Sequence, residues 1–272
     1  MIEGHVKKMR GILGSPVEYA LPVDGESVAL NPYLGKRIAL TYLGEIHCLN
    51  CGKRTKKSYS QGFCYVCMTK LAQCDLCIMK PETCHYHLGT CREPQWGEEF
   101  CFQDHYVYLA NSSGLKVGIT RHSQVPTRWI DQGATQALPI FKVSTRLQSG
   151  QVEMVLKQYV ADKTDWRKML KGQAASKDLY EERDRLIASA KNELKAVQAS
   201  NEAGDIQLLT GEKQLDIEYP VLEYPEKVKS MNFDKTPKIE GVLLGIKGQY
   251  LILDKGVLNI RKFTSYNVQF DA

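Results

Sequence analysis

Long hydrophobic segments are missing from this chain of 272 residues. No stretch approaches roughly 18 consecutive apolar residues, which predicts that the chain has no transmembrane helix. The first residues, MIEGHVKKMRGILG, hold no apolar run followed by a small-residue cleavage site, so no secretory signal is expected. We therefore expect a cytoplasmic protein without a membrane partner.

The motifs of several large enzyme classes are also missing. The sequence contains no P-loop, no glycine-rich dinucleotide fingerprint and no Ser-His-Asp arrangement. The net charge of +5 is modest, and it favours nucleic-acid binding only where basic residues cluster. One such cluster is present at Lys53, Arg54, Lys56 and Lys57.

Cysteine is absent outside one short region, because all nine cysteines lie between Cys48 and Cys101. An odd, locally packed set without a signal peptide favours metal ligation over disulfides. Within CLNCGKRTKKSYSQGFCYVC, two C-x-x-C pairs can surround one zinc ion with four sulfur atoms at about 2.3 Å. The ligands of this predicted structural zinc ribbon are Cys48, Cys51, Cys64 and Cys67. The plain alternative is four buried free thiols.

A second zinc site is predicted among the other five cysteines. Cys74 and Cys77 form a third C-x-x-C pair, which we expect to bind zinc together with Cys84 and Cys91. The spacing does not exclude His87 or Cys101 as ligands. Alternatively, the third pair only packs under the first ribbon.

The segment after the cysteines predicts a compact α+β unit. Residues 105–120, HYVYLANSSGLKVGIT, read as two strands joined by an Asn-Ser-Ser-Gly turn. A short helix is expected within 121–134 and a strand over 138–145. Residues 150–166 then show apolar residues at helical spacing, with Glu153 beside the apolar stripe.

This order of elements resembles the GIY-YIG nuclease superfamily, whose three-stranded antiparallel sheet is flanked by helices. Tyr106 and Tyr108 lie in the segment that matches the first name-giving tripeptide, YVY here. Lys116 opens the match to the second, KVG, and replaces its tyrosine. Arg128 matches the family's helix arginine, and Glu153 matches its metal-binding glutamate. The overall layout is also similar to a bacterial family known only as a domain of unknown function.

The resemblance implies a metal-dependent phosphodiesterase. Tyr108, with Tyr106 near it, would position the attacking water, and Arg128 would hold the phosphate. Glu153 would bind Mg²⁺ or Mn²⁺. Lys116 either binds phosphate in place of the missing tyrosine or marks a sheet that lost its chemistry and kept its binding.

The ends of the chain are expected to form one further unit. Neither end has enough strands to bury a face alone, since an isolated hairpin is marginal in water. We predict that residues 1–46 and 206–272 form a discontinuous terminal β domain, a small β-barrel or sandwich. The zinc-binding block (47–104), the GIY-YIG-like domain (105–172) and a connecting helix (173–205) lie between them.

Three functions remain open from the sequence. The first is an endonuclease acting on DNA or RNA, and the second is an inactive module of the same fold that binds RNA, DNA or a ribosome. The third is a zinc-stabilised scaffold for protein interactions. For the first two, the residues expected to grip the nucleic-acid backbone are Lys53, Arg54, Lys56, Lys57 and Arg121.

Overall fold

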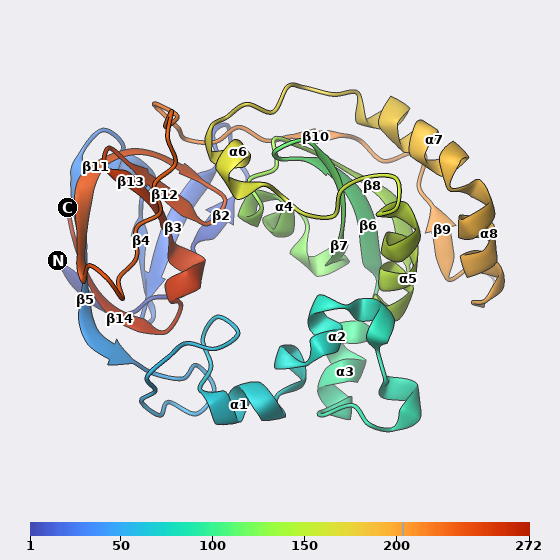
Figure 1. Ribbon diagram of the computed structural model, residues 1–272, viewed down its shortest axis with the longest axis horizontal. Coiled ribbons are helices and arrows are strands. Elements are labelled where there is room, and N and C mark those ends of the chain that lie inside the picture. The colour runs from blue at the N-terminus through green and yellow to red at the C-terminus, as the bar shows by residue number, and fades with distance from the viewer. Residues whose placement is uncertain (203) are drawn as a thin grey trace.

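The computed structural model of the protein, which describes residues 1–202 and 204–272, is a mixed α+β structure with three antiparallel sheets (Figure 1). This confirms the predicted α+β class. The two chain ends lie side by side, because the first strand pairs with the last. Pairing of the two ends gives each of them the neighbours that a lone hairpin lacks.

The largest sheet has six strands in the order β1-β14-β5-β11-β12-β13. Its strands are β1 (Ile2–His5), β5 (Arg37–Ile46), β11 (Lys238–Lys247), β12 (Tyr250–Leu253), β13 (Gly256–Asn259) and β14 (Tyr266–Asp271). In the described residues its outer strands, β1 and β13, do not pair with each other, so the sheet is open and the predicted barrel does not form. The long strand β11 changes partner instead, pairing with β5 up to Val242 and with β12 from Leu243.

A three-stranded sheet packs with this open sheet around one core. Its strands are β2 (Arg10–Ile12), β3 (Glu18–Val23) and β4 (Glu26–Ala29). Leu21 from this sheet and Leu40 and Ile239 from the larger one belong to the same buried hydrophobic cluster. The terminal segments therefore bury their apolar faces against each other, which is the arrangement expected of a sandwich.

The third sheet contains the predicted hairpin. It has the order β10-β8-β6-β7, and β9 also pairs with β8. Its strands are β6 (His105–Asn111), β7 (Leu115–Arg121), β8 (Gln136–Val143), β9 (Ile206–Leu208) and β10 (Leu215–Asp216). The sheet is wider than the predicted three strands, because β9 and β10 pair with β8. Both come from the start of the segment 206–272, which is predicted to belong to the terminal β domain.

Helices cover both faces of this third sheet (Figure 1). They are α4 (Thr127–Asp131), α5 (Arg146–Leu156), α6 (Trp166–Leu170), α7 (Leu179–Ser189) and α8 (Lys191–Ala199). Val107 on one face packs with α5, α7 and α8, whereas Tyr108 on the other face joins α4 and the terminal sheets in their common core. The predicted connecting helix is broken at Ala190 into α7 and α8. Because of this break, Leu186 and Leu194 both pack in the same hydrophobic cluster as Val107. No helix in the described residues is long and apolar enough to cross a lipid bilayer.

The cysteine-rich block from residue 47 to 104 is built differently. It contains α1 (Tyr65–Lys70), α2 (Leu76–Met79), α3 (Pro94–Cys101) and the short 3-10 helices η2 (Ala72–Cys74), η3 (Pro81–Thr83) and η4 (Tyr86–Leu88). None of its described side chains belongs to the three hydrophobic clusters of the molecule. A segment of this length without a hydrophobic core needs a covalent or metal cross-link to hold its fold.

Candidate functional site

The four cysteines of the predicted zinc ribbon meet in space. The sulfur atoms of Cys48, Cys51, Cys64 and Cys67 all lie within 4.8 Å of one another. The Cys51 and Cys64 sulfur atoms are 3.8 Å apart, and a tetrahedral zinc ion with Zn–S bonds of about 2.3 Å requires sulfur atoms about 3.8 Å apart. The cluster can therefore hold one structural zinc ion.

Backbone groups around this cluster suit thiolate ligands. Burial alone would raise the pKa of Cys48, but backbone N–H groups of Cys51, Cys64 and Asn50 lower it to about 6. The Asn50 side chain donates to the Cys67 sulfur atom at 3.4 Å. Gly52, which closes the first pair, has a φ of 68°, a conformation that glycine adopts without strain.

The hairpin of β6 and β7 buries the tyrosine singled out by the sequence. Tyr108 is 0% exposed, and it lies directly opposite Gly118 across the hairpin. A Cβ atom on Gly118 would come within 2.7 Å of the Tyr108 hydroxyl, so this phenol fits only against glycine. Gln132 donates a hydrogen bond of 2.7 Å to the Tyr108 oxygen. The phenol is thus fixed rather than free to rotate.

Helix α4 brings Arg128 to the same place and is anchored to the terminal sheets. Asp131 at its end accepts a hydrogen bond of 2.9 Å from buried Gln249 and an ion pair of 2.7 Å from Lys8. Burial raises the pKa of Tyr108, and the nearby Arg128 guanidinium opposes this effect. Arg128 therefore lies close enough to Tyr108 for their charges to interact.

Lys116 and Glu153 complete a cluster of interacting charges. Lys116 on β7 is 7% exposed; burial and then Arg128 lower its pKa to about 8, against the attraction of Glu153 and Asp162. Burial and then Asp162 raise the pKa of Glu153 on α5 to about 7, against the attraction of Lys116. The charge of Glu153 also raises the pKa of Tyr108, which lies on the preceding strand, β6. The side chains of Tyr108, Lys116, Arg128 and Glu153 therefore lie near enough for their charges to influence one another.

Two further residues of this site were missed from the sequence. The chain leaves α5 at Leu156, and its continuation runs along the free edge of β7, where Val117 N–H donates to Ala161 O at 2.8 Å. Asp162 thereby comes near enough to Glu153 for its charge to raise the pKa of that carboxyl group, and the Thr164 hydroxyl lies 3.4 Å from the Lys116 amine. The helical spacing over 150–166 predicts one continuous helix, whereas α5 ends at Leu156 and the chain then runs back beside β7. The polar run DKTD was the only signal of it.

Other predicted residues lie elsewhere. Tyr106 is half-buried, and its ring packs edge-on against His122 at 5.3 Å. Burial raises the pKa of Tyr106, and its charged neighbours, Glu212, Lys142 and Asp104, are not those of Tyr108. Arg121 is half-buried with its guanidinium over the Phe100 ring. The remaining basic residues are exposed on the first zinc loop: Lys53, Arg54, Lys56 and Lys57.

Three of the four cysteines predicted to bind a second zinc line one cavity, but among the described residues no group of three ligand atoms within 4.8 Å includes Cys84, Cys91 or Cys101. Cys77, Cys84 and Cys91 line one cavity, and the fourth cysteine in its lining is Cys101. Cys74 and the alternative ligand His87 do not line it. A different group of ligand atoms, from Asp75, Cys77 and His85, also lies within 4.8 Å. Among the described residues, no group of three metal-ligating side chains includes Glu153.

Comparison with known proteins adds a family and no activity. No curated protein and no solved structure matches the chain. A family described only as a protein of unknown function, DUF2797, matches residues 35–268. This match covers the cysteine block, the third sheet and the terminal strands β5, β11, β12 and β13, and the chain therefore belongs to the DUF2797 family.

Proposed function

We propose that the protein is a metal-dependent phosphodiesterase of the GIY-YIG type that acts on DNA or RNA. The observation that supports this proposal is the mutual electrostatic influence of Tyr108, Lys116, Arg128 and Glu153, which come from four different elements. These side chains span some 45 residues of sequence, and a merely structural role does not require them to share one site. A phenol, two cations and a carboxylate are the groups that hydrolysis of a phosphate ester uses.

Each group has a role that its surroundings support. Tyr108 keeps its proton at neutral pH, because burial raises its pKa, so it can donate a hydrogen bond to water or phosphate. Arg128 can hold two phosphate oxygen atoms at once. Lys116 is mostly protonated at pH 7, since its pKa is about 8, and replaces the second tyrosine as a phosphate ligand. Glu153, with Asp162 beside it, would hold Mg²⁺ or Mn²⁺.

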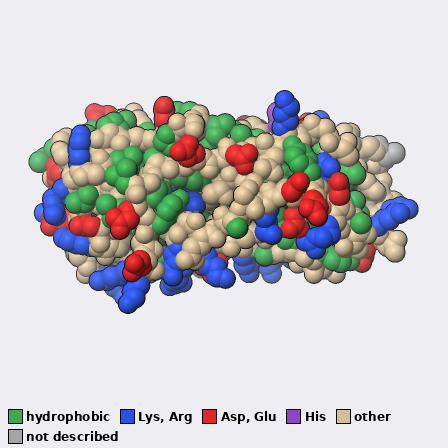
Figure 2. Space-filling model, turned by 90° about the horizontal axis from the view of Figure 1, so that it is seen from above, with side chains coloured by type: hydrophobic (Ala, Val, Ile, Leu, Met, Phe, Trp, Pro, Cys, Tyr) green, Lys and Arg blue, Asp and Glu red, His purple; other side chains and the backbone are tan. Residues whose placement is uncertain are grey.

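Unpaired basic side chains support a polyanionic substrate. Burial and then the nearby Arg128 lower the pKa of the Arg261 guanidinium. In the described part of the chain, neither Arg128 nor Arg261 forms an ion pair with a carboxylate. Figure 2 shows further Lys and Arg side chains along one long edge of the face that it depicts. Phosphate groups would relieve this repulsion.

One observation favours a second candidate, a module that binds nucleic acid without cutting it. Tyr108 is 0% exposed, so its phenol reaches a substrate only if the chain around it opens. A divalent ion would also have few protein ligands besides Glu153 and Asp162. In this alternative Lys116 and Arg128 hold phosphate, and no bond is broken.

Cleavage and binding assays separate the candidates. The purified protein is incubated with labelled single- and double-stranded DNA and RNA, with Mg²⁺ or Mn²⁺, beside Arg128→Ala and Glu153→Gln. Exposed Lys195→Ala on α8 is the matched control. We expect cleavage that both site variants abolish and the control retains.

The other outcomes are equally clear. Binding that weakens steeply with salt, is reduced by Arg128→Ala and is unaffected by Glu153→Gln, without cleavage, identifies the binding module. Failure to bind any nucleic acid contradicts both candidates and leaves a protein-interaction scaffold stabilised by zinc.

A further inference from the structure

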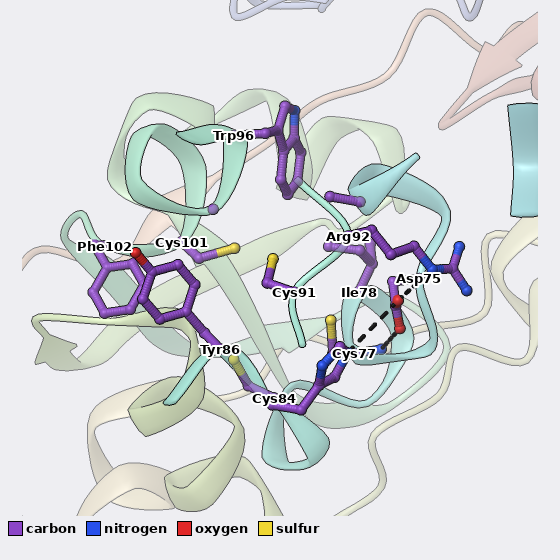
Figure 3. Close-up of a pocket in the computed structure, with 13 residues that line it drawn as sticks. Asp75, Cys77, Ile78, Cys84, Tyr86, Cys91, Arg92, Trp96, Cys101 and Phe102 are labelled. Atoms are coloured by element: carbon purple, nitrogen blue, oxygen red, sulfur yellow. Dashed lines mark hydrogen bonds and ion pairs between the residues drawn. The ribbon is translucent and has the colours of Figure 1, made fainter. Parts of the chain in front are cut away.

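A cavity in the second half of the cysteine block is lined by four cysteines. Figure 3 shows the sulfur atoms of Cys77, Cys84, Cys91 and Cys101 around one space. The cavity encloses about 20 Å³ of free space, which is room for a single water-sized occupant. Six residues lie between Cys77 and Cys84, six between Cys84 and Cys91, and nine between Cys91 and Cys101. No short sequence motif therefore marks these four cysteines as a set.

Local structure brings each sulfur atom to this space from a different short element. Cys77 lies in α2, Cys84 follows η3, and Cys101 ends α3. Cys91 follows a turn at Gly89, which ends η4 with a φ of 70°. Four short elements that converge through cysteine side chains are typical of a metal-centred fold.

Little else stabilises this region. Large apolar side chains in it are exposed to solvent: Leu76 (59%), Met79 (82%), Leu88 (67%) and Phe102 (48%). Because the region also lacks a share in the hydrophobic clusters, its short helices cannot be held by burial alone. Metal binding supplies folding free energy in domains of this kind.

The charges around the cavity match an anionic centre. The Arg146 guanidinium donates to Ile78 O, next to Cys77. Arg121 lies over the ring of Phe100, the residue before Cys101. The Arg146 Nε atom is buried and has no hydrogen-bond partner among the described residues. Four thiolates around Zn²⁺ carry a net charge of about −2, which two arginines neutralise.

The competing ligand group near this cavity is already occupied by protein partners. The Asp75 carboxylate forms an ion pair of 2.6 Å with Arg92, and its side chain caps α2. His85 lies between Asp75, at 3.6 Å, and the Thr90 hydroxyl, at 2.8 Å. These contacts suit residues that support a metal site rather than residues that ligate the metal.

We propose that Cys77, Cys84, Cys91 and Cys101 bind a second structural zinc ion, and that Cys74 takes no part in it. Binding releases four thiol protons, and rotation of the cysteine side chains draws the sulfur atoms to zinc-binding distance. Cys74 lies beside Ser60 and Cys48, on the side of the first cluster. The nine cysteines thus divide into two sets of four and one free thiol.

This second zinc supports the helix that carries Glu153. The Arg146 guanidinium donates a hydrogen bond of 2.6 Å to Ile78 O, next to Cys77. Further along α5, a Cβ atom on Gly150 would come within 2.6 Å of the Glu82 backbone nitrogen, so the helix and η3 are in close contact. Loss of the second zinc is therefore expected to loosen α5.

Counting zinc in the intact protein tests the proposal without any variant. Metal analysis and native mass spectrometry of the full chain should give two zinc ions. Brief alkylation of the native protein, mapped by peptide mass spectrometry, should modify Cys74 before any other cysteine. One zinc per chain, iron in place of zinc, or disulfides among the four cysteines would overturn the proposal.

Variants assign the ligands. Cys101→Ser should bind one zinc ion, whereas Cys101→His, which keeps a zinc-binding side chain, should bind two. Cys74→Ser, the matched control, should also bind two. Should Cys101→Ser fail to fold, the alkylation pattern of the native protein still decides. Two zinc ions in Cys101→Ser, or one in Cys74→Ser, would contradict the assigned ligand set.

Discussion

Replacement of Glu153 by glutamine gives the sharpest test of the charge cluster, because it requires no substrate. Burial and Asp162 raise the pKa of Glu153 from 4.5 to about 7. The folded protein therefore holds a proton that the unfolded chain has already released at intermediate pH. Folding stability must fall as the pH rises through this interval.

The sign and size follow from these two pKa values. The contribution of Glu153 to stability is fully present below about pH 4.5 and is lost as the pH rises to about 7. The whole interval corresponds to roughly 3 kcal/mol, of which about 2 kcal/mol falls above pH 5.5. Glutamine cannot ionise, so Glu153→Gln should gain this amount relative to the natural protein between about pH 5.5 and pH 8.

Urea unfolding followed by tryptophan fluorescence measures the difference at each pH. Zinc is kept in the buffer, no other divalent ion is added, and lower pH is avoided because thiolate ligands then protonate. Exposed Glu226→Gln is the control and should follow the natural protein at every pH. Addition of Mg²⁺ or Mn²⁺ at pH 8 should stabilise the natural protein and leave Glu153→Gln unchanged. A pH-independent difference between the two proteins would refute the buried charge cluster.

Three further substitutions test the packing around the sites. Gly118→Ala should lower stability by about 1–3 kcal/mol in urea unfolding, because its Cβ atom would meet the Tyr108 hydroxyl. Gly150→Ala should separate α5 from Glu82, and hydrogen exchange should then increase over α5 and η3 while the terminal sheets stay protected. Cys67→Ser should lose the first zinc and lower the melting temperature, as measured by metal analysis and calorimetry; unchanged zinc content would contradict that ligand set.

The fold could be predicted where the pattern was local. The hairpin over 105–120 has strong turn and strand signals, and it corresponds to β6 and β7. Pairing of the two chain ends followed from the need of each for neighbours. The open sheet could not be predicted, because it depends on the change of pairing partner of β11 at Leu243. This change is set by tertiary packing, and no local sequence pattern marks it. The break at Ala190 is also tertiary, since alanine is the best helix former.

The candidate site shows the same limit. The C-x-x-C pairs place two ligands next to each other in sequence, so the first cluster could be predicted from spacing alone. Cys101 could not be distinguished from Cys74, because its approach to Cys77 depends on how α3 packs against α2. Asp162 was hidden for a similar reason, since its approach to Glu153 depends on where α5 ends.

The cysteine block connects the two β units of the protein. At one end the block contacts the terminal sheet, where Ser265 donates to Gly62 O and Ser58 donates to Thr264 O, at 2.8 and 2.9 Å. At its other end it holds α5 through Arg146. The block therefore links the region near Arg261 to the helix that carries Glu153, and in Figure 1 it runs below both units. Because the described side chains of this link belong to none of the hydrophobic clusters, we expect its rigidity to depend on bound zinc. Chelation should then disturb the alignment of the basic side chains before it unfolds either sheet.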